Sequence, residues 1–179
     1  MDLQNITLVS FGYFEENFLK NIAEAVKHEF PFSVNIKEGH LDLSEFYDPS
    51  RRQYNGIKLL KEVDSIFSSD SAKTIGLFHV DLFIPILTYI FGQAFLNGRT
   101  GIASHYRLSN ERYGISSDDK FMLDRFKKEV IHELGHTFGL IHCNVSTCVM
   151  RSSTYVEDID QKNAKLCPGC RNNMNSMLL

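Results

Sequence analysis

The sequence has no tryptophan, and none of its apolar runs is long enough to cross a membrane. Its N-terminal residues lack the basic and apolar segments of a secretory signal. Lysine and arginine nowhere form more than an adjacent pair, and the formal net charge is -3. These absences argue against a membrane protein, a secreted protein and a protein that binds nucleic acid. We therefore expect a cytoplasmic location.

The chain length of 179 residues is sufficient for one domain, with or without a small appendage. Hydrophobic residues make up 43% of the chain and charged residues 23%, as in ordinary globular proteins. Because there are 14 phenylalanines and no tryptophan, we expect a core rich in phenylalanine. No motif sets the oligomeric state, and a monomer is the expectation.

The first half of the chain alternates between strand and helix patterns. Residues 6–14 are β-branched and aromatic, residues 16–30 have apolar side chains at helical spacing, and residues 32–39 alternate between apolar and polar. Helical spacing returns over residues 56–67, and residues 74–84 form a nearly continuous apolar run that is typical of a buried central strand. This βαβαβ order predicts an α/β fold with parallel strands and crossover helices.

The second half of the chain begins with residues 91–108, which predict two short strands at an exposed edge of the sheet. Residues 116–140 predict the clearest helix, which starts with a capping serine and an acidic first turn. A weaker helical pattern covers residues 156–166, and the segment CPGC at residues 167–170 predicts a tight turn.

The clearest helix carries the sequence HELGHTFGLIH, which begins at His132. Because residues four apart share one face of an α-helix, His132 and His136 can offer two imidazole nitrogens to a single zinc ion. Glu133 lies beside this face, where it would flank the metal without ligating it. Zinc lowers the pKa of a bound water, and an adjacent carboxylate can take the proton and pass it to a leaving amine. The pattern therefore indicates hydrolysis.

A catalytic zinc needs a third protein ligand and an open position, and His142 is the candidate. On a continuing helix, His142 would lie about 9 Å further along the axis than His136. Gly139 can solve this problem, because glycine readily adopts the left-handed conformation that ends a helix and redirects the chain. The alternative is that these are ordinary histidines on a helix surface, since the short pattern HExxH also occurs by chance. The fixed offsets of Gly139 and His142 favour the zinc site.

All four cysteines lie in the last quarter of the chain, as two closely spaced pairs. Four thiolates in this arrangement can hold one zinc ion in a tetrahedral site. The first alternative is two disulfides, which a reducing cytoplasm disfavours; the second is a redox-active CxxC, which lacks the expected βαβ context. We expect a structural zinc that closes a subdomain too small to build its own core. Its expected ligands are Cys143, Cys148, Cys167 and Cys170.

HELGHTFGLIH matches the metzincin motif HExxHxxGxxH, and Met150 follows where metzincins place a methionine-containing turn under the zinc site. The continuation CNVSTCVM, followed by CPGC, resembles the archaemetzincins, a family of zinc metallopeptidases within this clan. The spacing from Met150 to Cys167 is about one residue shorter than in the usual signature. Ser152 stands where other metzincins often have a tyrosine.

The resemblance implies a metzincin-like fold of α/β (α+β) class, with a mixed twisted sheet, crossover helices and an active-site helix. It divides the chain into an upper subdomain, residues 1–139, and a small zinc-stabilised C-terminal subdomain, residues 140–179. It also implies two zinc ions per chain, one catalytic and one structural. The roles that it implies are catalytic zinc binding by His132, His136 and His142, general-base catalysis by Glu133, and structural support by Gly139 and Met150.

The sequence therefore predicts a zinc metallopeptidase whose partner is a peptide or protein substrate, with no nucleic acid and no membrane involved. By the same resemblance, the substrate would lie between the upper sheet and the C-terminal subdomain, paired with an edge strand within residues 91–98. The alternative function is a zinc-stabilised module that binds peptides with little or no turnover. An intact Glu133 favours the enzyme.

Overall fold

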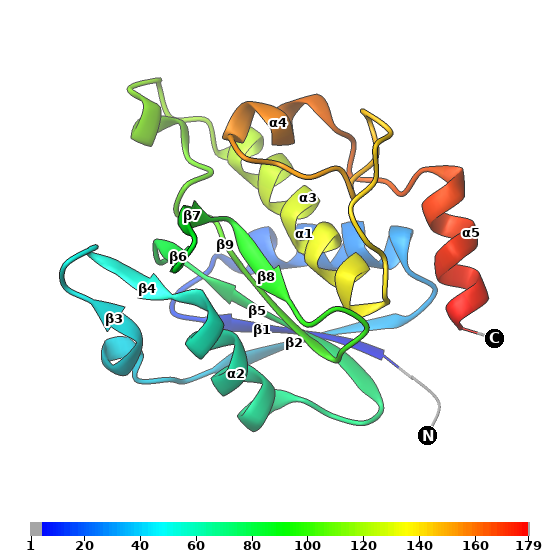
Figure 1. Ribbon diagram of the computed structural model, residues 1–179, viewed down its shortest axis with the longest axis horizontal. Helices are drawn as coiled ribbons and strands as arrows, with labels where there is room; N and C mark the ends of the chain where they lie inside the picture. Colours follow the sequence, from blue (N-terminus) through cyan, green and yellow to red (C-terminus); the bar gives the residue numbers. More distant parts are fainter. Residues whose placement is uncertain (1–4, 179) are drawn as a thin grey trace.

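The computed structural model describes residues 5–178, which form three layers, with helices on both faces of a central β-sheet (Figure 1). Four neighbouring strands of this sheet run parallel, and the strand at one edge runs antiparallel. The predicted βαβαβ order and α/β class are confirmed. Across the sheet the strands are β2 (Ser33–Gly39), β1 (Asn5–Phe11), β5 (Ala72–Phe78), β9 (Thr100–Ser104) and β8 (Gly92–Ala94).

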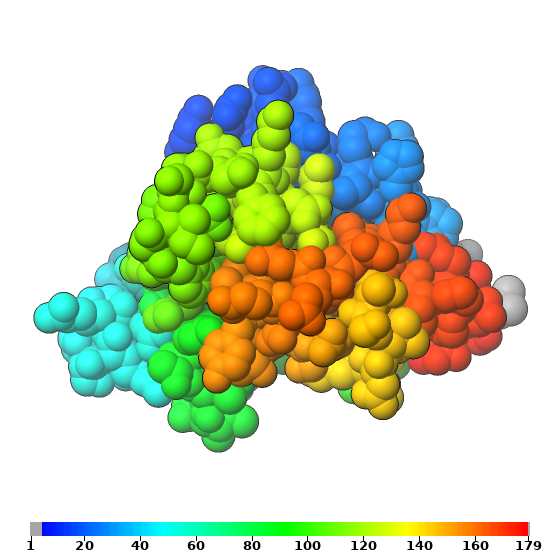
Figure 2. All heavy atoms as spheres, turned by 90° about the horizontal axis from the view of Figure 1, so that it is seen from above, coloured from blue at the N-terminus to red at the C-terminus, as the bar shows by residue number. Residues whose placement is uncertain are grey.

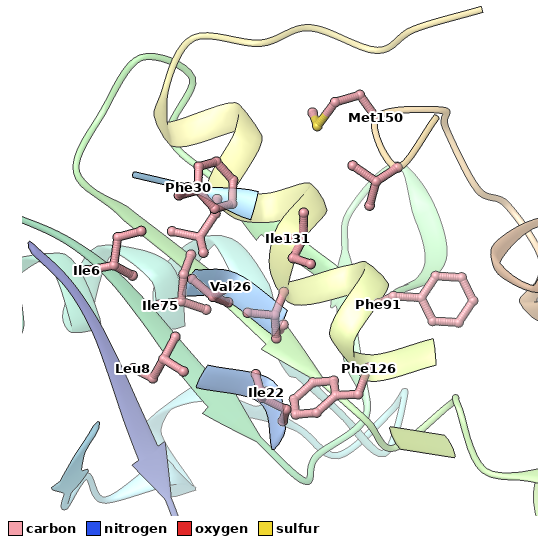
Figure 3. Packing of buried hydrophobic residues seen from close by; sticks show 14 of the residues in the cluster. Ile6, Leu8, Ile22, Val26, Phe30, Ile75, Phe91, Phe126, Ile131 and Met150 are labelled. Carbon is pink, nitrogen blue, oxygen red and sulfur yellow. The ribbon is translucent and has the colours of Figure 1, made fainter. Parts of the chain in front are cut away.

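Different helices cover the two faces of the central sheet. α1 (Glu16–Glu29) and α3 (Asp119–Thr137) pack on one face, and α2 (Gly56–Phe67) packs on the other. Burying one large apolar side chain contributes about 1.5–3 kcal/mol, so these two interfaces supply most of the stabilisation. The core is rich in phenylalanine, as predicted. Figure 3 shows part of the α1 and α3 side, where Ile6, Leu8 and Ile75 of the sheet pack with Ile22, Val26, Phe126 and Ile131 of the helices.

A second, smaller sheet begins just after β5. The apolar run over residues 74–84 was predicted as one strand, but it is divided between β5 and β6 (Leu82–Ile84). Asp81 lies between the two strands, and its carboxylate accepts hydrogen bonds from Arg107 at 2.6 and 2.7 Å. The strands of the second sheet are β3 (Tyr47–Asp48), β4 (Gln53–Asn55), β6 and β7 (Leu87–Ile90), and short 3-10 helices lie at η1 (Leu43–Phe46) and η2 (Asn110–Tyr113).

Two predictions for the middle of the chain are confirmed, one of them with a correction. The two strands within residues 91–108 are β8 and β9, which pair antiparallel, and β8 is an edge strand. The helix within residues 116–140 is α3, but its N-cap is Asp118 and not a serine. The Asp118 carboxylate accepts a hydrogen bond from Phe121 N at 3.0 Å. A carboxylate at this position also complements the positive end of the helix dipole.

Two short helices follow in the C-terminal region. α4 (Val156–Gln161) accounts for the weaker helical pattern and packs on α3. The CPGC segment was predicted as a tight turn, but it begins α5 (Pro168–Met177), with Cys167 as the N-cap. Proline suits the first helical turn because its missing N–H would have no intrahelical acceptor there. Among the described helices, none is both long and apolar enough to cross a membrane.

A buried ion pair attaches the C-terminal region to α3. Arg125 is 4% exposed, and its guanidinium donates to both carboxylate oxygens of Asp160, at 2.7 and 2.8 Å. Arg125 also donates to Leu108 O at 2.7 Å and to Asn110 Oδ1 at 2.9 Å. This bidentate pair with further acceptors satisfies a guanidinium that lies away from water. Arg125 thus joins α4 and the loop before α3 to α3 itself.

Replacing Arg125 with methionine should destabilise the fold, because Asp160 would lose its partner and two further acceptors would lose a donor. Breaking a buried pair from one side costs about 3 kcal/mol, which urea unfolding would measure. The control is Lys20→Met on α1, where Lys20 and Glu16 form an ion pair that is mostly exposed. That variant should change stability little. Equal losses in the two variants would show that Arg125 has no special structural role.

Candidate active site

One side of α3 carries ionisable side chains although much of it is buried. His132 and Glu133 come three and four residues after Glu129, and His136 comes four residues after His132, so all four side chains share this side of the helix. The exposed fractions are 4% for Glu129, 6% for His132 and 4% for Glu133. Burying such groups is unfavourable unless they are paired or bind a ligand. This side of α3 is therefore the first place to look for function.

The three histidines predicted to bind the catalytic zinc come together. The ligand nitrogens of His132, His136 and His142 lie within 4.8 Å of one another, and His132 Nε2 and His136 Nε2 are 3.1 Å apart. The ring centroid of His142 is 5.3 Å from that of His132 and 5.0 Å from that of His136. His132 is buried, His136 is half-buried and His142 is exposed. The group therefore opens toward solvent on the side of His142.

Backbone carbonyl groups hold two of the three imidazole rings. Nδ1 of His132 lies 2.8 Å from Val149 O, and Nδ1 of His136 lies 2.7 Å from Leu140 O. Because a carbonyl oxygen can only accept, each Nδ1 carries the hydrogen and each Nε2 presents a lone pair. Burial lowers the pKa of both histidines, which favours this neutral form. Lone pairs directed at the same place repel one another unless a cation lies between them, so the triad fits a zinc ion.

The chain returns to α3 through Gly139, whose φ of 87° lies in the left-handed region. Gly139 N donates to His136 O at 2.9 Å, which satisfies a carbonyl at the helix end. Lys73 Nζ donates to Thr137 O at 2.9 Å and places a positive charge at the negative end of the helix dipole. This reversal brings His142 back beside the other two histidines, as the sequence predicts.

Met150 is fully buried against the active-site helix, and Figure 3 shows its side chain directed toward α3. Its sulfur atom approaches Gly135 so closely that a Cβ atom at this position would overlap it. Met150 O accepts a hydrogen bond from Cys143 N at 3.0 Å. The methionine side chain therefore packs against α3 at Gly135, and its backbone is hydrogen-bonded to the loop that follows His142.

The histidine triad opens into a cleft of about 720 Å³. One wall comes from β7, β8 and Leu96, and the other comes from residues 152–155, which follow the Met150 turn. Figure 2 shows this second segment, in orange, next to the green part of the chain that contains β7 and β8. Exposed apolar side chains lie along the cleft, which suits the burial of apolar parts of a ligand. They are Leu87, Leu96, Ile141 and Tyr155.

Glu133 lines the cleft beside the histidines, and its Oε2 atom is buried without a hydrogen-bond partner in the described structure. Burial raises the pKa of Glu133 well above its ordinary value; the nearby Glu129 carboxylate raises it further, and Lys162 opposes the shift. Sequence reasoning identified Glu133 but missed Glu129 and Lys162. The position of Glu129 one helical turn before Glu133 was a usable signal, whereas Lys162 lies in a polar segment without a pattern.

The four cysteines form a second cluster, with all sulfur atoms within 4.8 Å of one another. Cys143 Sγ is 3.8 Å from Cys167 Sγ, and Cys148 Sγ is 3.8 Å from Cys170 Sγ. All four cysteines are free, so the alternative of two disulfides is wrong. Four thiolates at about 2.3 Å from zinc would lie about 3.8 Å apart along each edge of the tetrahedron. The cluster therefore fits a closed four-thiolate zinc site.

Comparisons with known proteins agree with this geometry. Residues 13–176 match the family described as Peptidase family M54. An archaemetzincin from Thermococcus kodakarensis is 38% identical over 172 residues, which cover 92% of each chain. The crystal structure of an archaemetzincin from Methanopyrus kandleri matches with a TM-score of 0.85 at 30% identity, over 98% of this chain and 96% of that one. The crystal structure of a zinc-dependent peptidase from Methanocorpusculum labreanum also matches with a TM-score of 0.85, at 27% identity, over 96% of this chain and 100% of that one.

The histidine triad lies at the end of the long helix α3, and the fold is similar to that of a solved zinc-dependent peptidase and a solved archaemetzincin. Together these features define the protein as a zinc metallopeptidase. Within this class, the chain belongs to peptidase family M54, the archaemetzincins. The family and fold predicted from the sequence are thus confirmed.

Replacing Gly135 with alanine should destabilise the protein, because the added methyl group would collide with Met150 Sδ. Overpacking of this kind costs about 1–3 kcal/mol, measurable by chemical unfolding. The second variant, Gly135→Ala with Met150→Ala, removes the collision. It should be no less stable than Met150→Ala alone. If Gly135→Ala costs as much without the methionine side chain as with it, the close packing of Met150 on α3 does not explain the effect.

Proposed function

We propose that His132, His136 and His142 hold the catalytic zinc of this metallopeptidase and that Glu133 is the general base. The observation that carries the proposal is the meeting of the triad and an unpaired carboxylate oxygen in one cleft. Zinc on these histidines would supply Lewis-acid chemistry, which acidifies water and polarises a carbonyl group. The open side near His142 leaves room for both.

Glu133 has the environment of a proton carrier. Its Oε2 atom is buried without a partner, so it can accept a proton without first breaking a hydrogen bond in the protein. Burial raises the pKa of this carboxyl group, which makes it a stronger base than an exposed glutamate. The same oxygen can then donate the proton to the amine that leaves when the peptide bond breaks. A carboxylate fixed beside the triad therefore suits both halves of the hydrolysis.

The edge strand β8 provides a place for an extended substrate. Its residues Gly92, Gln93 and Ala94 pair with β9 on one side and line the cleft. No described strand of the central sheet pairs with the other side of β8. A peptide can add to such an edge through main-chain hydrogen bonds while its side chains contact the apolar rim of the cleft. This mode of binding would hold a scissile bond near the triad.

The four cysteines would hold a second, structural zinc. Their sulfur spacing fits a tetrahedral thiolate site, and N–H groups of Val145, Cys167 and Cys170 point at three of the sulfur atoms at 3.4–3.5 Å. Such bonds stabilise the thiolate form that binds metal. We propose that this zinc closes residues 140–179 into a small subdomain beside residues 1–139.

Glu133→Gln is the direct test of the general base. The amide keeps the size of the side chain but cannot accept the proton, so cleavage of a peptide library should fall at least 100-fold, the usual scale for a lost general base. Zinc content, measured by metal analysis, should stay unchanged because Glu133 is not a proposed ligand.

His142→Ala provides the matching control, since it should lower both zinc content and cleavage. Full cleavage by Glu133→Gln would overturn the proposed role of Glu133. A wild-type protein that retains both zinc ions and binds peptides without Glu133-dependent cleavage would favour the alternative of a binding module.

Cys167→Ser should weaken retention of the catalytic zinc as well as the structural zinc. The reason is the chain path, because Cys143 follows His142 directly and Cys148 precedes Val149, whose carbonyl group holds His132. Dialysis against a chelator, followed by metal analysis, would measure both losses. Asn173→Ser, an exposed change on the same helix, is the control and should keep both ions. Loss of one ion only from Cys167→Ser would show that the two sites are independent.

A further inference from the structure

Unpaired polar atoms concentrate in the cleft. Within residues 5–178, four buried side-chain nitrogen or oxygen atoms have no hydrogen-bond partner. Three of them, Gln93 Oε1, Glu133 Oε2 and Ser153 Oγ, belong to residues that line the cleft. Buried polar groups in folded proteins are nearly always paired, so a group of exceptions in one cavity indicates contacts that a ligand completes. Glu133 has a proposed role in catalysis, but Ser153 does not.

Lys162 is the most unusual residue of the cleft. Its side chain is 2% exposed, yet it lines the cavity that contains the triad. Within the described structure, its Nζ atom donates one hydrogen bond, to Arg151 O at 2.9 Å, and no carboxylate oxygen lies within ion-pair distance. An ammonium group has three hydrogens to donate. A buried ammonium that faces a cavity with unused hydrogens is suited to bind an acceptor.

Lys162 and Ser153 both line the cleft, and Lys162 Nζ donates its hydrogen bond to Arg151 O, two residues before Ser153. Ser153 follows the Met150 turn, and Lys162 follows α4, which packs on α3. Burial lowers the pKa of Lys162, and the carboxyl groups of Glu129 and Glu133 on α3 oppose this shift. Glu129 lies four residues before Glu133, which corresponds to about 6 Å along the helix. Lys162 and Ser153 line the same cavity as the triad and Glu133, so a ligand bound by them would lie in the cleft of the proposed reaction centre.

The charges at this end of the cleft favour an acidic ligand. Lys162 is the sole lysine or arginine among the described residues that line the cavity. A carboxylate would give its ammonium the strong, charge-assisted partner that the protein itself does not provide. Ser153 Oγ can donate to the second oxygen of the same group. Glu129 also lines the cavity, but its carboxyl oxygens lie beyond ion-pair distance of Lys162 Nζ, so the ammonium group keeps unused hydrogens for a ligand.

We propose that Lys162 and Ser153 form a specificity pocket for an acidic side chain, aspartate or glutamate, on a substrate residue next to the scissile bond. This inference rests on the proposed function, because it assigns a substrate class to the same cleft. The apolar rim formed by Leu87, Leu96, Ile141 and Tyr155 would contact more distant substrate residues. Specificity would then come from one buried cation rather than from the shape of the rim.

The test compares peptides that differ at one position, with Glu, Gln, Leu or Lys on either side of the cleaved bond. Cleavage by the zinc-loaded wild-type protein is measured first, and binding to the zinc-loaded Glu133→Gln variant is measured by fluorescence anisotropy. We expect the Glu peptide to bind about tenfold more tightly than the Gln peptide in one of the two series, which is the usual scale for a charged hydrogen bond. In the Glu133→Gln background, Lys162→Met should reduce this ratio to about one, because it removes the cation.

Ser153→Ala in the same background keeps Lys162 and its bond to Arg151 O, so it tests the pocket without disturbing the Met150 turn. It should reduce the ratio severalfold at unchanged thermal stability. A binding ratio of one in both series for the Glu133→Gln protein would overturn the proposal, as would an added Lys162→Met change that lowers affinity for all four peptides equally. If the wild-type protein cleaves no peptide, the proposed function fails, and the binding ratio still decides whether the pocket selects acidic side chains.

Discussion

The return of the chain to α3 after Gly139 is the constraint on which the whole site depends. The segment that follows supplies three things at once: His142 itself, and the carbonyl groups of Leu140 and Val149 that orient the other two histidines. If the helix continued, His142 would lie about 9 Å further along the axis than His136. The left-handed conformation that prevents this costs little only for glycine. The meeting of the three histidines and the orientation of two of their rings therefore follow from one backbone conformation.

The charged side of α3 imposes a second requirement. Glu129 and Glu133 are buried on successive turns, where like charges repel, and nothing within α3 compensates them. Lys162 brings a positive charge from another segment, and a zinc ion on the triad would bring two more. Without these cations, burial of both carboxylates would be hard to reconcile with a stable fold. Two buried carboxyl groups beside a lysine and a histidine triad are typical of a reaction centre, and they do not stabilise the helix.

The parts of the site that the sequence predicted depend on local periodicity. The spacing of His132 and His136 places them on one face of a helix, and Gly139 marks the helix end. The four cysteines could be predicted as a cluster because thiols at this spacing commonly bind one metal ion. Lys162 was missed because its position depends on how α4 packs on α3, which no local pattern records. The single strand predicted over residues 74–84 was wrong for a related reason, since β5 and β6 pair with different, distant strands in two separate sheets.

Local sequence also predicted the ends of the helices only in part, because distant contacts help to decide where a helix begins. Proline is favoured in the first helical turn, but CPGC is equally compatible with a tight turn, so the sequence alone did not predict α5. The serine cap predicted for α3 was wrong because Asp118 is one position nearer and accepts the same kind of bond. Strand β2 matched its alternating pattern, yet it lies at a sheet edge and is mostly exposed. The alternating pattern was enough to predict this strand, but its exposure could be known only from its position in the sheet.

The order of residues in the chain explains why two ligand clusters adjoin each other. Cys148, Val149 and Met150 are consecutive: the first belongs to the thiol cluster, the carbonyl group of the second holds His132, and the third packs on Gly135. A shift of the thiol cluster would therefore move the support of the histidines. The C-terminal segment also needs outside attachment, which Glu29 provides by accepting hydrogen bonds from Leu166 N and Arg171. A segment of this size has too small a core to hold such positions by packing alone, and a metal on the four thiols would fix them.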